Sequence, residues 1–136
     1  MGDEKPSVIV TGIAGNLGLR LLPLLTDYQI IGVDLNPPQT SHPLRFLRMD
    51  LGLEESCREL FLLLREARPV AFLHLAFVLD PVHTGVFDLD RMWQINVAGT
   101  ARVMEALTEA NRDAEIVTKF ADEPGHPTRA RRPDPR

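Results

Sequence analysis

The sequence predicts an α/β fold with a doubly wound, mostly parallel sheet, and three observations lead to this prediction. Short apolar segments rich in β-branched residues alternate with longer segments of helical periodicity. A glycine-rich turn joins the first such pair. The chain has 136 residues, 44% of them hydrophobic and 25% charged, as in an ordinary globular domain. Alternating strands and helices imply parallel strands joined by helical crossovers.

The first strand is expected at Ser7 to Gly12, an apolar run that ends at a glycine. A helix is expected over Asn16 to Thr26. Its many leucines predict that it is covered on much of its surface, and Pro23 predicts a kink or an early end.

Two further strands follow close together. Gln29 to Asp34 is short, apolar and closed by a carboxylate, and Arg45 to Met49 is a third strand that ends at Asp50. Asn36 to Pro43, between them, is rich in Pro, Ser and Thr and is expected to be a loop.

The second half of the chain continues the alternation. Glu54 to Arg68 has helical spacing and is stopped by Pro69. Val70 to Phe77 is nearly continuous in apolar residues, which is typical of a strand buried on both faces. A loop is expected at Asp80 to Gly85, and then a long helix at Leu89 to Ala110. The inner face of that helix is predicted to comprise Met92, Ile95, Val103, Ala106, Leu107 and Ala110.

The end of the chain differs in composition. Glu115 to Thr118 is expected to begin a fifth strand, whereas residues 124–136 hold four prolines and four arginines. We therefore predict a domain over residues 1–118 and a disordered, Pro/Arg-rich tail over residues 119–136. An alternative for the tail is a basic segment that binds an anion or a partner.

The segment Thr11 to Gly18 reads TGIAGNLG and falls between the first strand and the first helix. The first glycine permits a sharp turn, the second a close approach of the backbone to a pyrophosphate, and the third close packing of the helix on the strand. Asp34 lies 22 residues after Gly12, where a carboxylate accepts hydrogen bonds from ribose hydroxyls and repels a 2′-phosphate. The sequence therefore predicts an NAD site rather than an NADP site. A glycine-rich turn without a ligand is the alternative.

The chain resembles the extended short-chain dehydrogenase/reductase family, the NAD-dependent epimerases and dehydratases. The resemblance covers roughly residues 7 to 118. It rests on TGIAGNLG at 11–18, VDLN at 33–36, MDL at 49–51, HLAF at 74–77 and INVAGT at 95–100. It implies an α/β, Rossmann-like doubly wound parallel sheet, truncated after about five strands.

The resemblance also implies roles for individual residues in binding NAD. Gly12, Gly15 and Gly18 would cradle the pyrophosphate, with backbone N–H groups from Asn16 and Leu17. Asp34 would bind the adenosine ribose. Asp50 and Leu51 would flank the adenine. Leu75 and Ala76 would line the path towards the nicotinamide ribose, and Asn96 would support the site from its helix.

Several of these residues have simpler interpretations. Asp50 is also suited to capping a turn, and Asn96 to an ordinary place on a helix surface. His74 is expected to be packed or hydrogen-bonded rather than catalytic, and Gly99 to allow close helix packing. Phe77 departs from the alanine usual in the family, which would narrow the cleft. The histidines have no metal-ligand spacing, so no metal is predicted.

The pair that performs acid–base chemistry in this family, Tyr-x-x-x-Lys, is missing. The single tyrosine is Tyr28, with Gly32 four residues on, and the lysines are Lys5 and Lys119. We therefore expect the NAD-binding half of an oxidoreductase, a truncated or alternative product, inactive alone. The alternatives are a non-catalytic NAD-binding regulatory or partner-binding module, and a subunit that pairs with a full-length homologue. The substrate is not predicted.

Composition excludes other classes of function. The net charge of −4 gives no basic surface for nucleic acid. No segment is long and apolar enough to span a membrane, and residues 1–6 do not resemble a secretory signal, so a cytoplasmic location is expected. Cys57, the single cysteine, is expected to be a buried or half-buried helix residue. An uncovered sheet edge predicts self-association.

Overall fold

The computed structural model describes residues 4–78 and 87–114. Its centre is a parallel sheet of four strands in the order β3-β2-β1-β4. The strands are β1 (Ser7–Thr11), β2 (Gln29–Asp34), β3 (Arg45–Arg48) and β4 (Ala71–His74). The chain runs outwards from β1 through β2 to β3 and then returns to the other side of β1. This confirms the predicted doubly wound α/β fold and places its switch point between β1 and β4.

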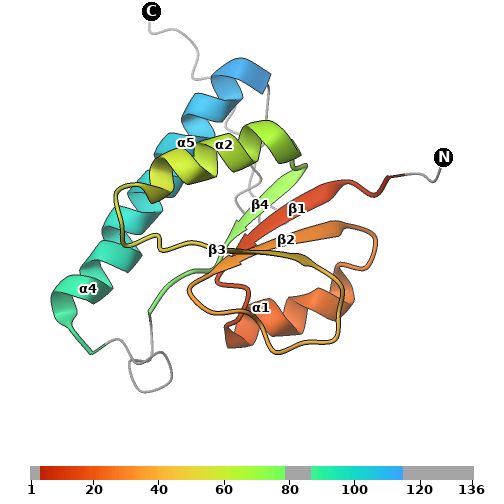
Figure 1. The fold of residues 1–136 in the computed structure, drawn as a ribbon, viewed down its shortest axis with the longest axis horizontal. Helices are drawn as coiled ribbons and strands as arrows, with labels where there is room; N and C mark the ends of the chain where they lie inside the picture. The colour runs from red at the N-terminus through yellow and green to blue at the C-terminus, as the bar shows by residue number, and fades with distance from the viewer. Residues whose placement is uncertain (1–3, 79–86, 115–136) are drawn as a thin grey trace, which may run out of the picture.

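Helices cover both faces of the sheet (Figure 1). The helix α1 (Asn16–Leu21) and the 3₁₀ turn η1 (Leu22–Leu24) lie on one face. The other face carries α2 (Ser56–Ala67) and α5 (Gly99–Ala114). A short helix α4 (Leu89–Trp93) and a π-helical turn η2 (Gln94–Ala98) lead into α5.

The central strands are buried on both faces because successive side chains point to opposite sides. In β1, Val8 and Val10 pack in the cluster on the α1 side, whereas Ile9 packs with α2 and α5. In β2, Ile30 belongs to the first cluster and Ile31 to the second. The two cores therefore fix the register of the sheet.

The prediction that the first helix is covered on much of its surface is wrong. Leu17 is 56% exposed and Leu24 is 76% exposed. A helix on a sheet buries one side only, and here Leu22 is buried while Leu19 and Leu25 pack partly against the same core. The predicted early end is confirmed, because α1 gives way at Leu22 to the 3₁₀ turn that contains Pro23.

Two later elements also differ from the prediction. The fourth strand ends at His74 rather than Phe77, and only Phe72 in it is fully buried, because β4 lies at one edge of the described sheet. The long helix is interrupted by η2 and extends to Ala114. Its predicted inner face is confirmed: Met92 is half-buried and the other five positions are buried. The expected loop at 80–85, fifth strand and tail lie outside the described residues.

Candidate functional site

The turn after β1 lies at the carboxyl edge of the sheet, beside the switch point. Gly12 has a φ of +73°, and its N–H donates to the carbonyl of Val33 at 2.8 Å. A Cβ on Gly12 would lie 2.7 Å from the backbone nitrogen of Ala76 and 2.8 Å from the carbonyl oxygen of Leu75. Glycine is therefore required here for its left-handed conformation and for the close approach of the chain that follows β4.

The other two glycines of the turn are in different surroundings. A Cβ on Gly18 would lie 2.7 Å from the carbonyl oxygens of both Gly12 and Ile13, so Gly18 allows α1 to pack against the turn. A Cβ on Gly15 would meet only the Gly12 oxygen, at 3.2 Å, and Gly15 is exposed. The packing of the chain itself thus accounts for Gly12 and Gly18. Gly15 leaves an open approach to the backbone, as a bound pyrophosphate would need.

The backbone around Gly15 also offers hydrogen-bond donors. Asn16 and Leu17 form the first turn of α1, where helical N–H groups have no acceptor within the helix. Both side chains are exposed, so they leave this part of the turn accessible to solvent.

Asp34, at the end of β2, contacts the glycine-rich turn directly. Its Oδ2 accepts from the N–H of Ala14 at 2.9 Å, and its Oδ1 accepts from the N–H of Leu35 at 2.6 Å. The half-buried carboxylate is therefore fixed beside the turn, with unused lone pairs on both oxygens. The sequence pattern had not pointed to Ala14, because the contribution comes from its backbone.

The segment Asp50–Gly52 follows β3 at the same edge of the sheet. The N–H of Met49 donates to the carbonyl of Asp34 at 3.0 Å, which keeps this segment beside β2. Asp50 Oδ1 accepts from the N–H of Gly52 at 2.9 Å, so Asp50 does cap a turn, as the simpler interpretation expects. Its Oδ2 also forms an ion pair with Arg91, which the sequence analysis had not singled out. Arg91 lies 41 residues away, and no local pattern connects the two.

Leu75 and Ala76 follow β4 and are held by the hydroxyl of Thr11. Thr11 Oγ accepts from the N–H of Leu75 at 3.0 Å and from the N–H of Ala76 at 3.2 Å. These bonds draw the chain across the end of β1, next to Gly12, and they coincide with the end of the β4 ladder. Phe77, the next residue, is 53% exposed.

His74 is hydrogen-bonded at both ring nitrogens, as expected. Thr11 Oγ already accepts two N–H groups, so its hydroxyl donates to Nδ1, 2.7 Å away. The Thr100 hydroxyl donates to the carbonyl of Asn96 at 2.6 Å and therefore accepts from Nε2–H, 3.0 Å away. Burial lowers the pKa of His74 below its ordinary 6.5. The imidazole is thus neutral at pH 7, with its proton on Nε2.

Asn96 lies in η2 and binds the backbone beyond β4. Its Oδ1 accepts from the N–H of Val78 at 2.6 Å, and its Nδ2 donates to the carbonyl of Val78 at 3.1 Å. Asn96 is therefore not an ordinary surface residue. It fixes the path of the chain on the β4 side of the switch point.

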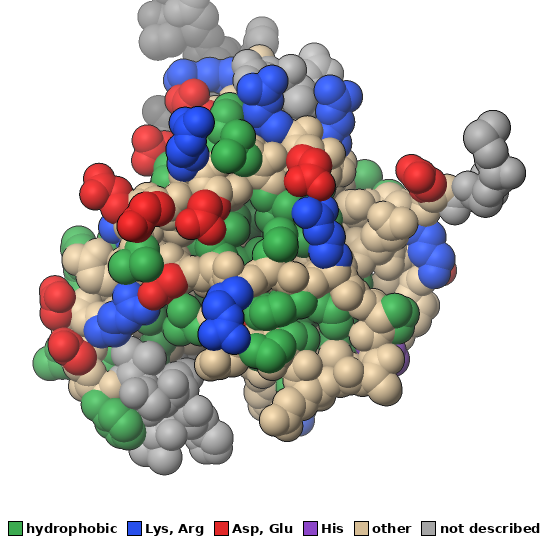
Figure 2. Space-filling model, viewed as in Figure 1, with side chains coloured by type: hydrophobic (Ala, Val, Ile, Leu, Met, Phe, Trp, Pro, Cys, Tyr) green, Lys and Arg blue, Asp and Glu red, His purple; other side chains and the backbone are tan. Residues whose placement is uncertain are grey.

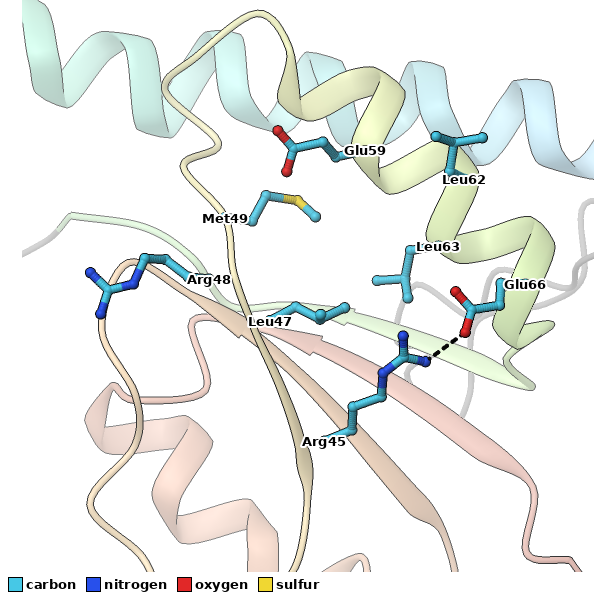
Figure 3. Close-up of a pocket in the computed structure, with 8 residues that line it drawn as sticks. All are labelled: Arg45, Leu47, Arg48, Met49, Glu59, Leu62, Leu63 and Glu66. Carbon is cyan, nitrogen blue, oxygen red and sulfur yellow. Dashed lines mark hydrogen bonds and ion pairs between the residues drawn. The ribbon is translucent and has the colours of Figure 1, made fainter.

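A pocket of about 290 Å³ lies elsewhere, between β3 and α2 (Figure 3). It is lined by Arg45, Leu47, Arg48, Met49, Glu59, Leu62, Leu63 and Glu66. None of these is a predicted cofactor residue, and Arg45 forms an ion pair with Glu66 at 2.9 Å across it. Figure 2 shows acidic and basic side chains interspersed around hydrophobic ones on this face. The mixed charges give it no clear ligand chemistry.

In residues 4–78 and 87–114, no group of His, Cys, Asp and Glu is placed to hold a metal ion. No helix in these ranges is long and apolar enough to cross a membrane. Cys57 is half-buried, as expected, and burial together with the Glu105 carboxylate raises the pKa of its thiol, which disfavours the reactive thiolate.

Comparison with solved structures finds the same fold. MoeE5 in complex with UDP-glucose and NAD is 30% identical, with a TM-score of 0.60, and the match covers 77% of this chain and 33% of that one. The Bordetella bronchiseptica enzyme WbmH in complex with NAD⁺ is 21% identical, with a TM-score of 0.63 over 79% of this chain and 37% of that one. A nucleoside-diphosphate-sugar epimerase from Agrobacterium tumefaciens is 22% identical, with a TM-score of 0.63 over 85% and 36%.

The chain thus spans about a third of the length of these solved structures. A search of curated proteins gives no match. The model of the NAD dependent epimerase/dehydratase family matches residues 8–121, which include β1 except for Ser7, the glycine-rich turn and every other described strand and helix. The chain therefore belongs to the NAD dependent epimerase/dehydratase family.

Proposed function

We propose that this chain binds NAD(H) at the carboxyl edge of its sheet, as the cofactor half of an epimerase/dehydratase-like oxidoreductase. The glycine-rich turn carries the proposal. Its backbone is open at Gly15, and the Asp34 carboxylate is bonded to it through Ala14. Family membership and the complex of MoeE5 with NAD support the same cofactor.

The described geometry supports a division of roles along the cofactor. Gly12, Gly15 and the first turn of α1 would hold the pyrophosphate, and Asp34 would accept hydrogen bonds from the ribose of the adenosine half. Asp50 and Leu51, at the end of β3, would hold the adenine. Leu75 and Ala76, beside the end of β1, would hold the nicotinamide half, and Asn96 fixes the backbone that follows them. When bound, NAD accepts or returns a hydride, and these residues bind and orient it.

A second candidate is a non-catalytic NAD-binding module that regulates or binds a partner. Tyr28, the single tyrosine, directly precedes β2 and so lies at the amino edge of the sheet, opposite the glycine-rich turn. It is therefore too far from the proposed site to act as its acid or base. Finding the Tyr-x-x-x-Lys pair, in a longer form of this chain or in a protein that binds it, would favour the oxidoreductase over the second candidate.

Calorimetry with NAD⁺, NADH and NADP⁺ tests the proposal on the purified chain. We expect the wild type to bind NAD(H) in preference to NADP⁺. Asp34→Ala removes the acceptor for the ribose hydroxyls, so NAD affinity should fall about tenfold. Asp34→Asn keeps the shape but removes the charge, so discrimination against NADP⁺ should narrow.

Asp27→Ala is the matched control, because Asp27 is exposed and lies before β2, at the opposite edge of the sheet. It should leave binding unchanged. A folded wild-type sample that binds neither NAD⁺ nor NADH would contradict the proposal.

A further inference from the structure

The helix that runs through α4, η2 and α5 holds the segment Asp50–Gly52 at several points. Arg102 Nη1 donates to the carbonyl of Leu51 at 2.9 Å. A Cβ on Gly99 would lie 3.0 Å from the same carbonyl oxygen, so this segment packs closely on the helix. The chain after β3 runs out to this helix before α2 begins (Figure 1). The position of Asp50 is therefore set by the helix as well as by the sheet.

Arg91 makes the most specific of these contacts. Its Nη2 forms an ion pair with Asp50 Oδ2, and the two side chains are only 33% and 23% exposed. A Cβ on Gly52 would overlap the Arg91 guanidinium, which therefore lies close to the backbone of Gly52. A larger residue at position 52 would require the Arg91 side chain to shift.

Arg91 forms its ion pair with Asp50 although acidic residues lie closer in the sequence. Two acids lie near it on its own helix, Asp88 and Asp90. Asp88 Oδ1 accepts from the N–H of Asp90 at 2.8 Å and caps α4, which places Arg91 in the first turn. Arg91 nevertheless pairs with Asp50, on a different element. Since Asp50 Oδ1 is bonded to Gly52, the carboxylate has one donor on each oxygen and a fixed orientation.

We propose that Arg91 is a positioning residue for the adenine half of the site. It orients the Asp50 carboxylate so that a remaining lone pair accepts an N–H from the exocyclic amino group of adenine. Hypoxanthine has an oxygen at that position, which a carboxylate repels. Arg91 therefore sets the preference for an adenine nucleotide over its hypoxanthine counterpart. This inference rests on the proposed NAD-binding function.

The test compares the dissociation constants of NAD⁺ and nicotinamide hypoxanthine dinucleotide. We expect the wild type to prefer NAD⁺ about tenfold, as for one hydrogen bond to a charged acceptor. Arg91→Met should reduce this ratio to within about threefold of unity, and Arg91→Lys, which keeps a charged donor, should restore part of it. Arg112→Met, at an exposed ion pair on the same helix, should leave the ratio unchanged.

The ratio separates positioning from a general loss of structure, because a loosened site weakens both dinucleotides alike. Asp50→Asn should lose the preference even with Arg91 in place, which tests the same contact if Arg91→Met folds poorly. An unchanged ratio in folded Arg91→Met or Asp50→Asn, or a wild type without preference, overturns the role of Arg91 alone. A folded wild type that binds neither dinucleotide overturns the proposed function as well.

Discussion

Single residues at this site are distinguished by what surrounds them rather than by their type. The three glycines of the turn look alike in the sequence, but only at Gly15 would an added Cβ stay at least 3.0 Å from the surrounding atoms. His74 ends a strand of the sheet, and its hydrogen bonds to Thr11 and Thr100 make it a link between β1, β4 and α5. Its role is to hold these elements together in the neutral form.

Alanine at Gly18 should therefore affect mainly the stability of the fold, and alanine at Gly15 mainly the affinity for NAD. Gly18→Ala forces a Cβ to within 2.7 Å of two carbonyl oxygens and should lower the free energy of unfolding by about 1–3 kcal/mol. Gly15→Ala should change it by less than about 1 kcal/mol, yet weaken NAD binding at least about tenfold. Urea denaturation and calorimetry measure the two effects. Normal NAD affinity in Gly15→Ala would remove the turn from the proposed site.

The buried imidazole makes stability depend on pH in a defined direction. Because the pKa of His74 is lower in the folded chain than the ordinary 6.5, the unfolded chain binds more protons between those two values. The free energy of unfolding should be unaffected by this group above pH 6.5 and should fall as the pH drops through that window. Denaturant titrations from pH 7.5 to 5.5 measure this, and His74→Gln should remove its contribution. ¹⁵N spectra of the ring that show a proton on Nδ1 would contradict the assigned tautomer.

At the scale of elements, the helix over residues 89–114 connects the two halves of the proposed site. Arg91 in α4 and Arg102 in α5 contact the segment after β3, and Asn96 in η2 contacts the chain after β4. A π turn holds one residue more per hydrogen-bonded ring than an α turn, so it sets the rotation of α4 relative to α5. The hydrophobic pattern predicted the buried face correctly but not this turn.

Removal of Val97 should therefore disturb the site from a distance. Val97 is 51% exposed and lies in η2, so its deletion allows the π turn to become an α turn. The helix on one side would rotate by about 100° relative to the other, so the contacts of Arg91 with Asp50 and of Arg102 with Leu51 could not both survive. We expect a lower Tm and weaker NAD binding. Val97→Ala, which keeps the length, should change stability by no more than about 0.5 kcal/mol. Equal behaviour of the two variants would show that the turn has no such role.

At the scale of the whole molecule, helices cover both faces of the sheet (Figure 1), whereas its two edge strands each have a partner strand on one side only among the described residues. Among the described residues, β3 pairs only with β2, and β4 only with β1. Strand edges carry unpaired backbone groups that can bind another chain. The chain also spans about a third of the solved structures that it resembles. Because of the two edge strands, we predict that the chain associates with itself or with a longer homologue.

Sedimentation velocity over a range of concentrations tests this prediction. We expect the sedimentation coefficient to rise with concentration. Val70→Lys adds a charge beside the start of β4, at a position 47% exposed, and should reduce association. Leu53→Lys, at a site 49% exposed outside the strands, is the control and should not. A wild type that stays monomeric throughout would show that its edges do not recruit another copy.

The sequence by itself determined the alternation of strands and helices, the position of the glycine-rich turn and the carboxylate at the end of β2. These features depend on hydrophobic periodicity and on turn residues within a short stretch of sequence, so they can be predicted without knowledge of the tertiary structure. It misjudged the exposure of Leu17 and the length of β4, because burial depends on which elements pack alongside.

Only the tertiary structure decided the strand order, the π turn and the contacts that surround the proposed site. Asp50 and Arg91 are 41 residues apart, and Thr11 and His74 are 63 apart. Such pairs meet because parallel strands bring their carboxyl ends to one edge and a helix crosses beside them. No pattern within a single element can specify which distant side chain arrives there.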